Sequence, residues 1–130
     1  MANPRALGVA LRDRVTGRLM TYVLGSALEN HDEEGVASDP RFGENDTFYL
    51  QALATLPMVQ NATEVENYVL EALRARAQAA GFSYLSTLIE ERLLETGPEW
   101  LRTAAVLGRN PNYLRSGTAF VYLQTTLALG

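Results

Sequence analysis

The chain has 130 residues, of which 47% are hydrophobic and 20% are charged, and it contains no cysteine. This length and composition are typical of one folded domain, and they exclude a disordered chain, a disulfide scaffold and a cysteine-based zinc site. No apolar run reaches the roughly 20 residues that span a bilayer. The first five residues do not begin a secretory signal, so we expect a cytoplasmic protein without membrane contact.

The first predicted element is a helix that begins at Asn3-Pro4 and reaches about Leu28. Asparagine caps helices, and proline is tolerated at the first helical position. Apolar residues then recur every three to four positions, as on one face of a helix: Leu7, Leu11, Val15, Leu19, Tyr22 and Val23. The next segment, residues 29–46, is polar and acidic, and it predicts a long loop. His31 beside Asp32 does not match the spacing of known metal motifs, so we expect a solvated loop and no metal site.

A helical hairpin over residues 63–96 is the element around which we expect the chain to fold. A shorter helix is predicted before it, from Asn45 or Asp46 to Pro57. Thr63 and Glu66 have the spacing of a capping box, in which each side chain bonds the other residue's backbone N–H. Gly81 suits the end of the first hairpin helix, and Ser83 suits the cap of the second.

Two more helices are predicted, over residues 96–108 and from Asn110-Pro111 to Leu129. The last is apolar on most sides from Ala119 onward, so it is either central or faces a partner. We therefore predict a partner interface at Tyr113, Phe120 and Tyr122. The expected fold class is all-α: one domain, 1–130, forming a compact bundle of about five or six helices, with helix content well above the usual third.

Candidate functional residues come from the charge pattern, because no catalytic motif is present. There is no Gly-x-Ser-x-Gly elbow and no glycine-rich phosphate loop with a lysine, so we expect no catalytic residue, no cofactor and no enzyme. All eleven basic residues are arginine, and the net charge is −4. Residues 100–130 hold three arginines and no acid, and two more arginines lie on one side of the first predicted helix. Because arginine binds phosphate bidentately, we predict nucleic-acid contacts at Arg12, Arg18, Arg102, Arg109 and Arg115.

The segment Gly81–Ile89 resembles the helical part of ribbon-helix-helix repressors, which often show Gly-x-Ser followed by a serine and two apolar residues. The resemblance covers about Ala72 to Leu94. The ribbon that reads DNA in that family would fall on Met58–Thr63, which shows little alternation and no basic residue. It implies a DNA-binding regulator as one alternative.

A longer stretch, Tyr49 to Leu129, resembles the helical small subunit of CRISPR effector complexes, particularly of type III. The matching features are a tyrosine-bearing helix ending in Leu-Pro at Pro57, a long helix from Thr63, and an aromatic-rich last helix, Ala119–Leu123, preceded by Tyr113. The family's basic pair near the C-terminus is replaced by Gln124-Thr125-Thr126. The resemblance implies a non-catalytic subunit of an RNA-guided ribonucleoprotein. Its partners would be other subunits, copies of itself, and guide RNA or target strand. A virion or other structural subunit explains the same features.

Overall fold

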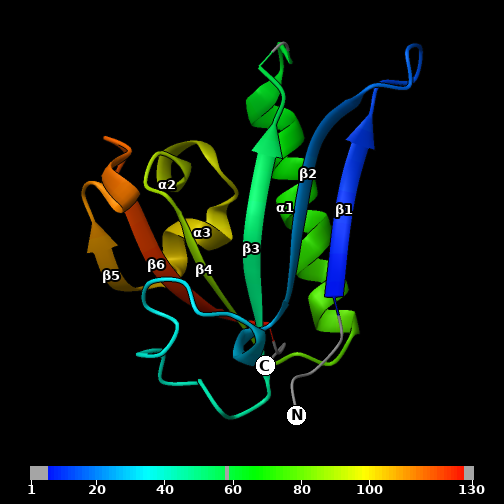
Figure 1. The fold of residues 1–130 in the computed structure, drawn as a ribbon. Helices are drawn as coiled ribbons and strands as arrows, with labels where there is room; N and C mark the ends of the chain where they lie inside the picture. The colour runs from blue at the N-terminus through cyan, green and yellow to red at the C-terminus, as the bar shows by residue number, and fades with distance from the viewer. Residues whose placement is uncertain (1–5, 58, 128–130) are drawn as a thin grey trace.

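A mixed six-stranded sheet, not a helical bundle, forms the centre of the computed structural model, which describes residues 6–57 and 59–127. The strand order is β1-β2-β3-β4-β6-β5 (Figure 1). The strands are β1 (Ala6–Arg12), β2 (Leu19–Ala27), β3 (Thr47–Thr55), β4 (Tyr84–Glu90), β5 (Ala105–Asn110) and β6 (Phe120–Thr126). The helices are α1 (Ala62–Ala79), α2 (Leu93–Thr96) and α3 (Glu99–Thr103), with 3-10 turns at Leu28–Asn30 and Tyr113–Arg115. The all-α prediction is therefore wrong.

Over residues 6–27 the predicted first helix is an antiparallel hairpin of β1 and β2, and its predicted start at Asn3-Pro4 lies outside the described residues. Its apolar residues alternate as in a strand, since Leu7, Val9 and Leu11 point toward α1 and the residues between them are exposed. Residues four apart share a face in a strand as well as in a helix, so the spacing that predicted a helix fits both. Gly17, with φ +72°, lies in the turn, where a left-handed backbone favours glycine.

The predicted hairpin 63–96 is a long helix, a strand and a short helix: α1 (Ala62–Ala79), then β4, then α2. Of the two later predicted helices, the first contains α3 and the start of β5, and the second contains β6. β4 alternates between the two sides of the sheet: Leu85 and Ile89 lie in the main apolar core, and Ser86 points to the other side. No described helix is long and apolar enough to cross a membrane.

The two faces of the sheet are covered differently. In Figure 1, α1 passes behind β1, β2 and β3, while α2 and α3 lie with β4 and β6. The main apolar core lies on the face covered by these helices and includes Val69, Leu73 and Phe82. The other face is crossed by the segment 28–46, whose Leu28 and Val36 form a second cluster with Tyr49 and Tyr122. We call this segment the crossing loop.

Candidate functional site

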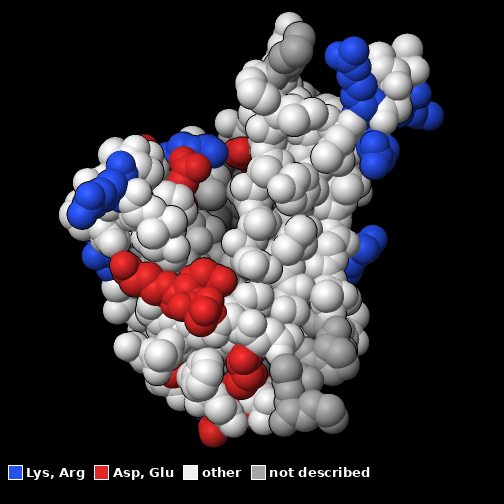
Figure 2. Space-filling model, in the orientation of Figure 1, with Lys and Arg blue, Asp and Glu red and all other residues white. Residues whose placement is uncertain are grey.

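The middle of the sheet is split between β3 and β4. These strands are parallel and pair over only four residues each, Thr47–Leu50 with Tyr84–Thr87. Beyond them β3 and β4 diverge as a V (Figure 1), and Figure 2 shows the surface hollowed between the two halves. A cavity of about 160 Å³ lies in the V; its walls are Leu50, Gln51, Ala52, Leu53, Leu88, Ile89, Glu90, Arg92, Leu93 and Phe120. We call this cavity the strand cleft.

A β-bulge in β3 lies where the split begins. Leu24 pairs with Ala52 and Gly25 pairs with Leu50, so Gln51 is an extra residue without a partner on β2. Such a bulge bends a strand and disrupts the local ladder. Gly25 permits this close approach, because a Cβ there would lie 2.1 Å from the Tyr49 carbonyl oxygen. Backbone polar groups beyond Leu50 are thus free of β4 and available to a ligand in the cleft.

Tyr49 lies just before the bulge, on the face covered by the crossing loop. Its ring is 1% exposed and stacks on Tyr122, with 6.3 Å between the ring centroids. Burial, assisted by the negative charge of Glu33, raises the pKa of Tyr49 far above its ordinary value. The phenol therefore stays neutral and protonated beside the narrow end of the cleft.

An ion pair between buried Glu66 and half-exposed Arg92 joins the two arms of the V at the wide end. Glu66, in the second turn of α1, is 5% exposed and accepts a hydrogen bond of 2.9 Å from Thr55 Oγ1 at the end of β3. Arg92, just after β4, donates to both Glu66 oxygens at 3.4 Å and to Glu90 at 2.9 Å. The Glu66 contact is the main reason why the pKa of Arg92 is raised. The capping-box prediction for Glu66 is therefore wrong, because its carboxylate binds across the cleft.

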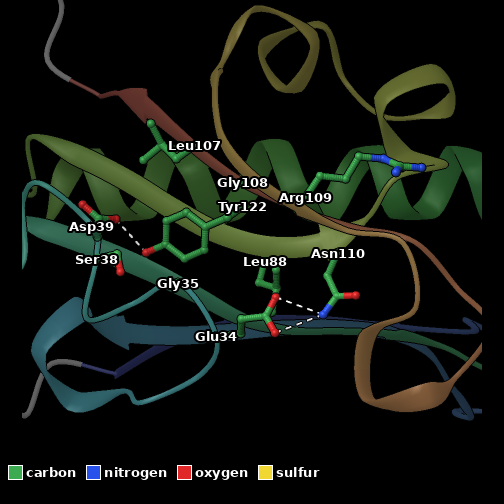
Figure 3. A pocket seen from close by; sticks show the side chains of 10 residues that line it. All are labelled: Glu34, Gly35, Ser38, Asp39, Leu88, Leu107, Gly108, Arg109, Asn110 and Tyr122. Atoms are coloured by element: carbon green, nitrogen blue, oxygen red, sulfur yellow. Dashed lines mark hydrogen bonds between the residues drawn. The ribbon is translucent and has the colours of Figure 1, made fainter.

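A second, smaller cavity of about 90 Å³ adjoins the cleft through Leu88, which lines both. Figure 3 shows its walls: the crossing loop contributes Glu34, Gly35, Ser38 and Asp39, and the opposite side is formed by Tyr122 and the end of β5, including Arg109 and Asn110. Asn110 Nδ2 donates to both Glu34 oxygens at 3.0 and 3.1 Å. Acidic residues also gather on the surface over this loop (Figure 2). We call this cavity the acidic pocket.

Asp39 fixes the crossing loop to the sheet. Its carboxylate is buried and accepts hydrogen bonds from Ser86 Oγ and Tyr122 Oη at 2.6 Å each, from Gln124 Nε2 at 2.7 Å and from the Arg41 N–H at 2.8 Å. Four donors compensate the charge that burial would otherwise penalise. Burial and the bond to Asp39 also raise the pKa of Tyr122, which stays protonated as a donor.

His31 forms another contact between the loop and the sheet. Its side chain is 5% exposed, its Nε2 lies 2.8 Å from Ser26 Oγ, and its ring lies 4.7 Å from that of Tyr49. Burial lowers the pKa of His31, and the nearby carboxylates of Glu33 and Asp32 only partly oppose this effect. The folded protein therefore favours the neutral imidazole.

We expect the free energy of unfolding to fall as the pH falls below 6.5, with a measurable share due to His31. The unfolded chain takes up a proton at the ordinary histidine pKa of 6.5, whereas the folded chain resists it, so the unfolded state binds more protons in acid. Stability from neutral His31 is complete above pH 6.5 and is lost as the pH falls through that value. Urea unfolding on either side of it should show a larger acid loss for the wild type than for His31→Gln, and equal losses would contradict this.

The structure disperses the arginines predicted to bind nucleic acid. Arg12 and Arg18 flank the β1–β2 turn, and Arg12 Nη1 donates to the Gly17 carbonyl at 3.3 Å. Arg102 donates to the Gly97 carbonyl at 3.0 Å, and Arg109 pairs with Glu91. The segment 100–130 has no acid of its own, but an acid from earlier in the chain neutralises one of its arginines. Arg115, in the turn before β6, is exposed. Nucleic-acid contact by these five remains a prediction.

The predicted partner-interface residues do not form one exposed surface. Tyr122 is 3% exposed and is bound to Asp39 inside the fold. Tyr113 and Phe120 are half-buried and contact each other, with 4.8 Å between the ring centroids. The sequence analysis missed Gln51, Glu66 and Arg92 as site residues. The only signal in the sequence was the acid Glu66 beside the apolar face of a predicted helix. We had interpreted Glu66 as part of a capping box with Thr63.

No protein-family model and no curated protein matches the chain. Solved structures do match its fold. The ribosomal-protein-S18-alanine N-acetyltransferase from Escherichia coli has a TM-score of 0.65 at 12% identity, covering 98% of this chain and 73% of that one. The aminoglycoside 6'-N-acetyltransferase from Enterococcus faecium has a TM-score of 0.58 at 11% identity, covering 98% and 78%. A protein assigned to the GNAT family of acetyltransferases, from Desulfovibrio desulfuricans, has a TM-score of 0.61 at 12% identity, covering 95% and 70%.

This likeness shows the fold, and it overturns the earlier functional interpretation. The CRISPR small subunit, the ribbon-helix-helix regulator and the structural-assembly subunit all required a helical protein, so these interpretations are wrong. The expectation that the chain is not an enzyme is corrected by the same finding, since its structural neighbours are acetyltransferases.

The donor that this fold family implies is acetyl-coenzyme A, a thioester on a long arm that ends in a nucleoside diphosphate. The strand cleft suits the arm, because it combines apolar walls such as Leu53 and Leu88 with strand edges that an extended chain can pair with. The wide end of the cleft does not suit the diphosphate, because the carboxylates of Glu64, Glu66 and Glu90 lie on the elements that border it. The residues therefore fit the thioester arm and not the whole donor.

Proposed function

We propose that the chain transfers an acetyl group from a thioester to an amine, with the thioester in the strand cleft and the amine in the acidic pocket. The observation that carries the proposal is the split of β3 from β4 at a β-bulge, within a fold shared with N-acetyltransferases. A cleft of this kind admits an extended arm and presents unpaired backbone groups to it.

The reaction needs three things from the protein. The amine nitrogen attacks the thioester carbonyl carbon, the C–S bond breaks, the thiolate leaves and takes up a proton, and the amine loses one. Free backbone N–H groups near Gln51 are suited to polarise the carbonyl, as in other acyl-transfer sites. Glu34 attracts the cationic form of the amine to the acidic pocket, because the one arginine among the described lining residues, Arg109, is already paired with Glu91. The closed face around Tyr49 and Tyr122 keeps water from the carbonyl.

The test is a transfer assay with the purified protein. We would incubate it with S-acetylpantetheine or acetyl-coenzyme A and a panel of primary amines, including a polyamine and a peptide with a free N-terminus. Thiol release would be followed optically, and the acetylated amine would be identified by mass. We expect amine-dependent thiol release, fastest for amines with more than one positive charge. Thiol release that does not depend on the amine, or no acetylated product from either thioester, would refute the proposal.

A further inference from the structure

The parallel strands fix where a nucleoside diphosphate would have to lie. In open sheets, ligands bind beyond the carboxyl ends of parallel strands, and diphosphates bind at the N-terminus of the helix that follows. Here that place is the wide end of the strand cleft, where β3 ends at Thr55 and α1 begins at Ala62.

The charges at this place oppose a diphosphate. Glu64 is exposed in the first turn of α1, and Glu66, two residues further, is buried and bonded to Arg92 of the cleft wall. Carboxylates in these positions already complement the helix dipole. The cation on the wall of the cleft is the guanidinium of Arg92, which is bonded to both Glu66 and Glu90. A phosphate at the wide end would therefore meet the carboxylates of Glu66 and Glu90 and one arginine that is already paired with both, with the further acid Glu64 in the first turn of α1.

The loop between β3 and α1 also lacks the residues that form a phosphate cradle. Such cradles use glycines, so that successive backbone N–H groups can converge on the phosphate. No glycine occurs between Gly43 and Gly81, and Pro57 contributes no N–H to the loop.

Arg18 is the one arginine among the described residues of a cavity beside the start of α1, where it could attract a diphosphate. A cavity of about 480 Å³ between the β1–β2 turn and this loop is lined by Arg18, Gln60 and Asn61, and by apolar residues. Asp13 lines the same cavity, so its charge is balanced rather than strongly positive. Substitution of Arg18 therefore tests whether a diphosphate binds at this place.

We infer that the acetyl donor is recognised through its pantetheine-type thioester arm alone, with no contribution from a nucleoside diphosphate. This rests on the proposed acetyl transfer in the strand cleft. The arm could be that of a free small thioester or that of a carrier protein, since both present the same chemistry to the cleft. The chain thus selects its donor by what fits between β3 and β4.

The experiment compares three donors at fixed amine: S-acetylpantetheine, acetyl-coenzyme A and an acetylated acyl carrier protein. Calorimetry with pantetheine and coenzyme A gives affinity independently of turnover. We expect kcat/KM and affinity for the coenzyme A forms to be no more than about threefold better than for the pantetheine forms. If transfer from the carrier protein is faster than from S-acetylpantetheine, the natural donor is a protein-bound thioester. If it is equal or slower, the natural donor is a free thioester.

A matched pair of variants tests the electrostatic reason. Glu64→Gln should improve binding of coenzyme A and leave pantetheine unchanged, because only the former carries a diphosphate near α1. Glu71→Gln, exposed two turns further along the same helix, should change neither.

The inference is overturned if coenzyme A binds more than about tenfold tighter than pantetheine and Arg18→Gln removes that advantage. That result would leave the proposed acetyl transfer intact. Failure of all three donors to acetylate any amine would instead refute the proposed function, and this inference with it.

Discussion

Ala52→Phe should lower the rate of acetyl transfer by at least about 100-fold, because it fills the strand cleft where the thioester must lie. Ala52 follows the bulge at Gln51 and lines the cavity, which holds only about 160 Å³. A phenyl ring there takes the space of the arm rather than of a core neighbour. The free energy of unfolding should therefore change by no more than about 1 kcal/mol. Steady-state thiol release and urea unfolding measure the two effects separately.

The control is Ala75→Phe, the same change on the exposed side of α1. It should leave both activity and stability close to wild type, which shows that an added aromatic side chain is not harmful in itself. Full activity of Ala52→Phe with either thioester would mean that the donor does not enter between β3 and β4. A large loss of stability in Ala52→Phe would instead show that the cleft closes in solution.

Asp39→Ala should lower the free energy of unfolding by about 3 kcal/mol, since the side-chain donors of Ser86, Tyr122 and Gln124 lose their acceptor in a buried place. For a domain of this size the melting temperature should fall by about 10 °C. Asp39→Asn keeps one acceptor oxygen but turns an N–H toward these donors, so it should fall between the alanine variant and the wild type. Calorimetry checks all three.

Asp32→Ala is the matched control for Asp39→Ala, because Asp32 is exposed on the same loop. It should change the unfolding free energy by less than about 0.5 kcal/mol. If Asp39→Ala melted like the control, the crossing loop would be held by its apolar residues Leu28 and Val36 rather than by the carboxylate.

The sequence allowed α1 to be predicted because its signals are local. Val65, Val69 and Leu73 repeat with the helical period over a long segment, and the structure buries all three. Strands β1 and β2 were mistaken for a helix because Leu7 and Leu11 are four apart, a separation that suits either element. β4 and β6 are buried on both sides over most of their length, so apolar residues are adjacent in each, as at Leu88-Ile89 and Phe120–Leu123, and strict alternation does not mark them as strands.

The candidate site was beyond prediction for a different reason: its parts are distant in sequence. The partners of Asp39 lie 47, 83 and 85 residues away, and Glu66 meets Arg92 across 26 residues. The strand cleft has no side-chain motif, because it is formed by the point at which two backbones stop pairing. One sequence without its fold does not show such a point.

The position of β6 has a consequence for how the protein is made. β6 is the last described strand in the chain, yet it lies inside the sheet, between β4 and β5. When the chain has emerged from the ribosome as far as Asn110, β4 has formed but the edge that pairs with β6 is free. Leu85 and Ile89 then lack their core neighbours on β6. Such an edge pairs readily with other chains. The nascent protein is thus most prone to aggregate just before β6 emerges from the ribosome. A chain released at that point would expose the unpaired edge of β4.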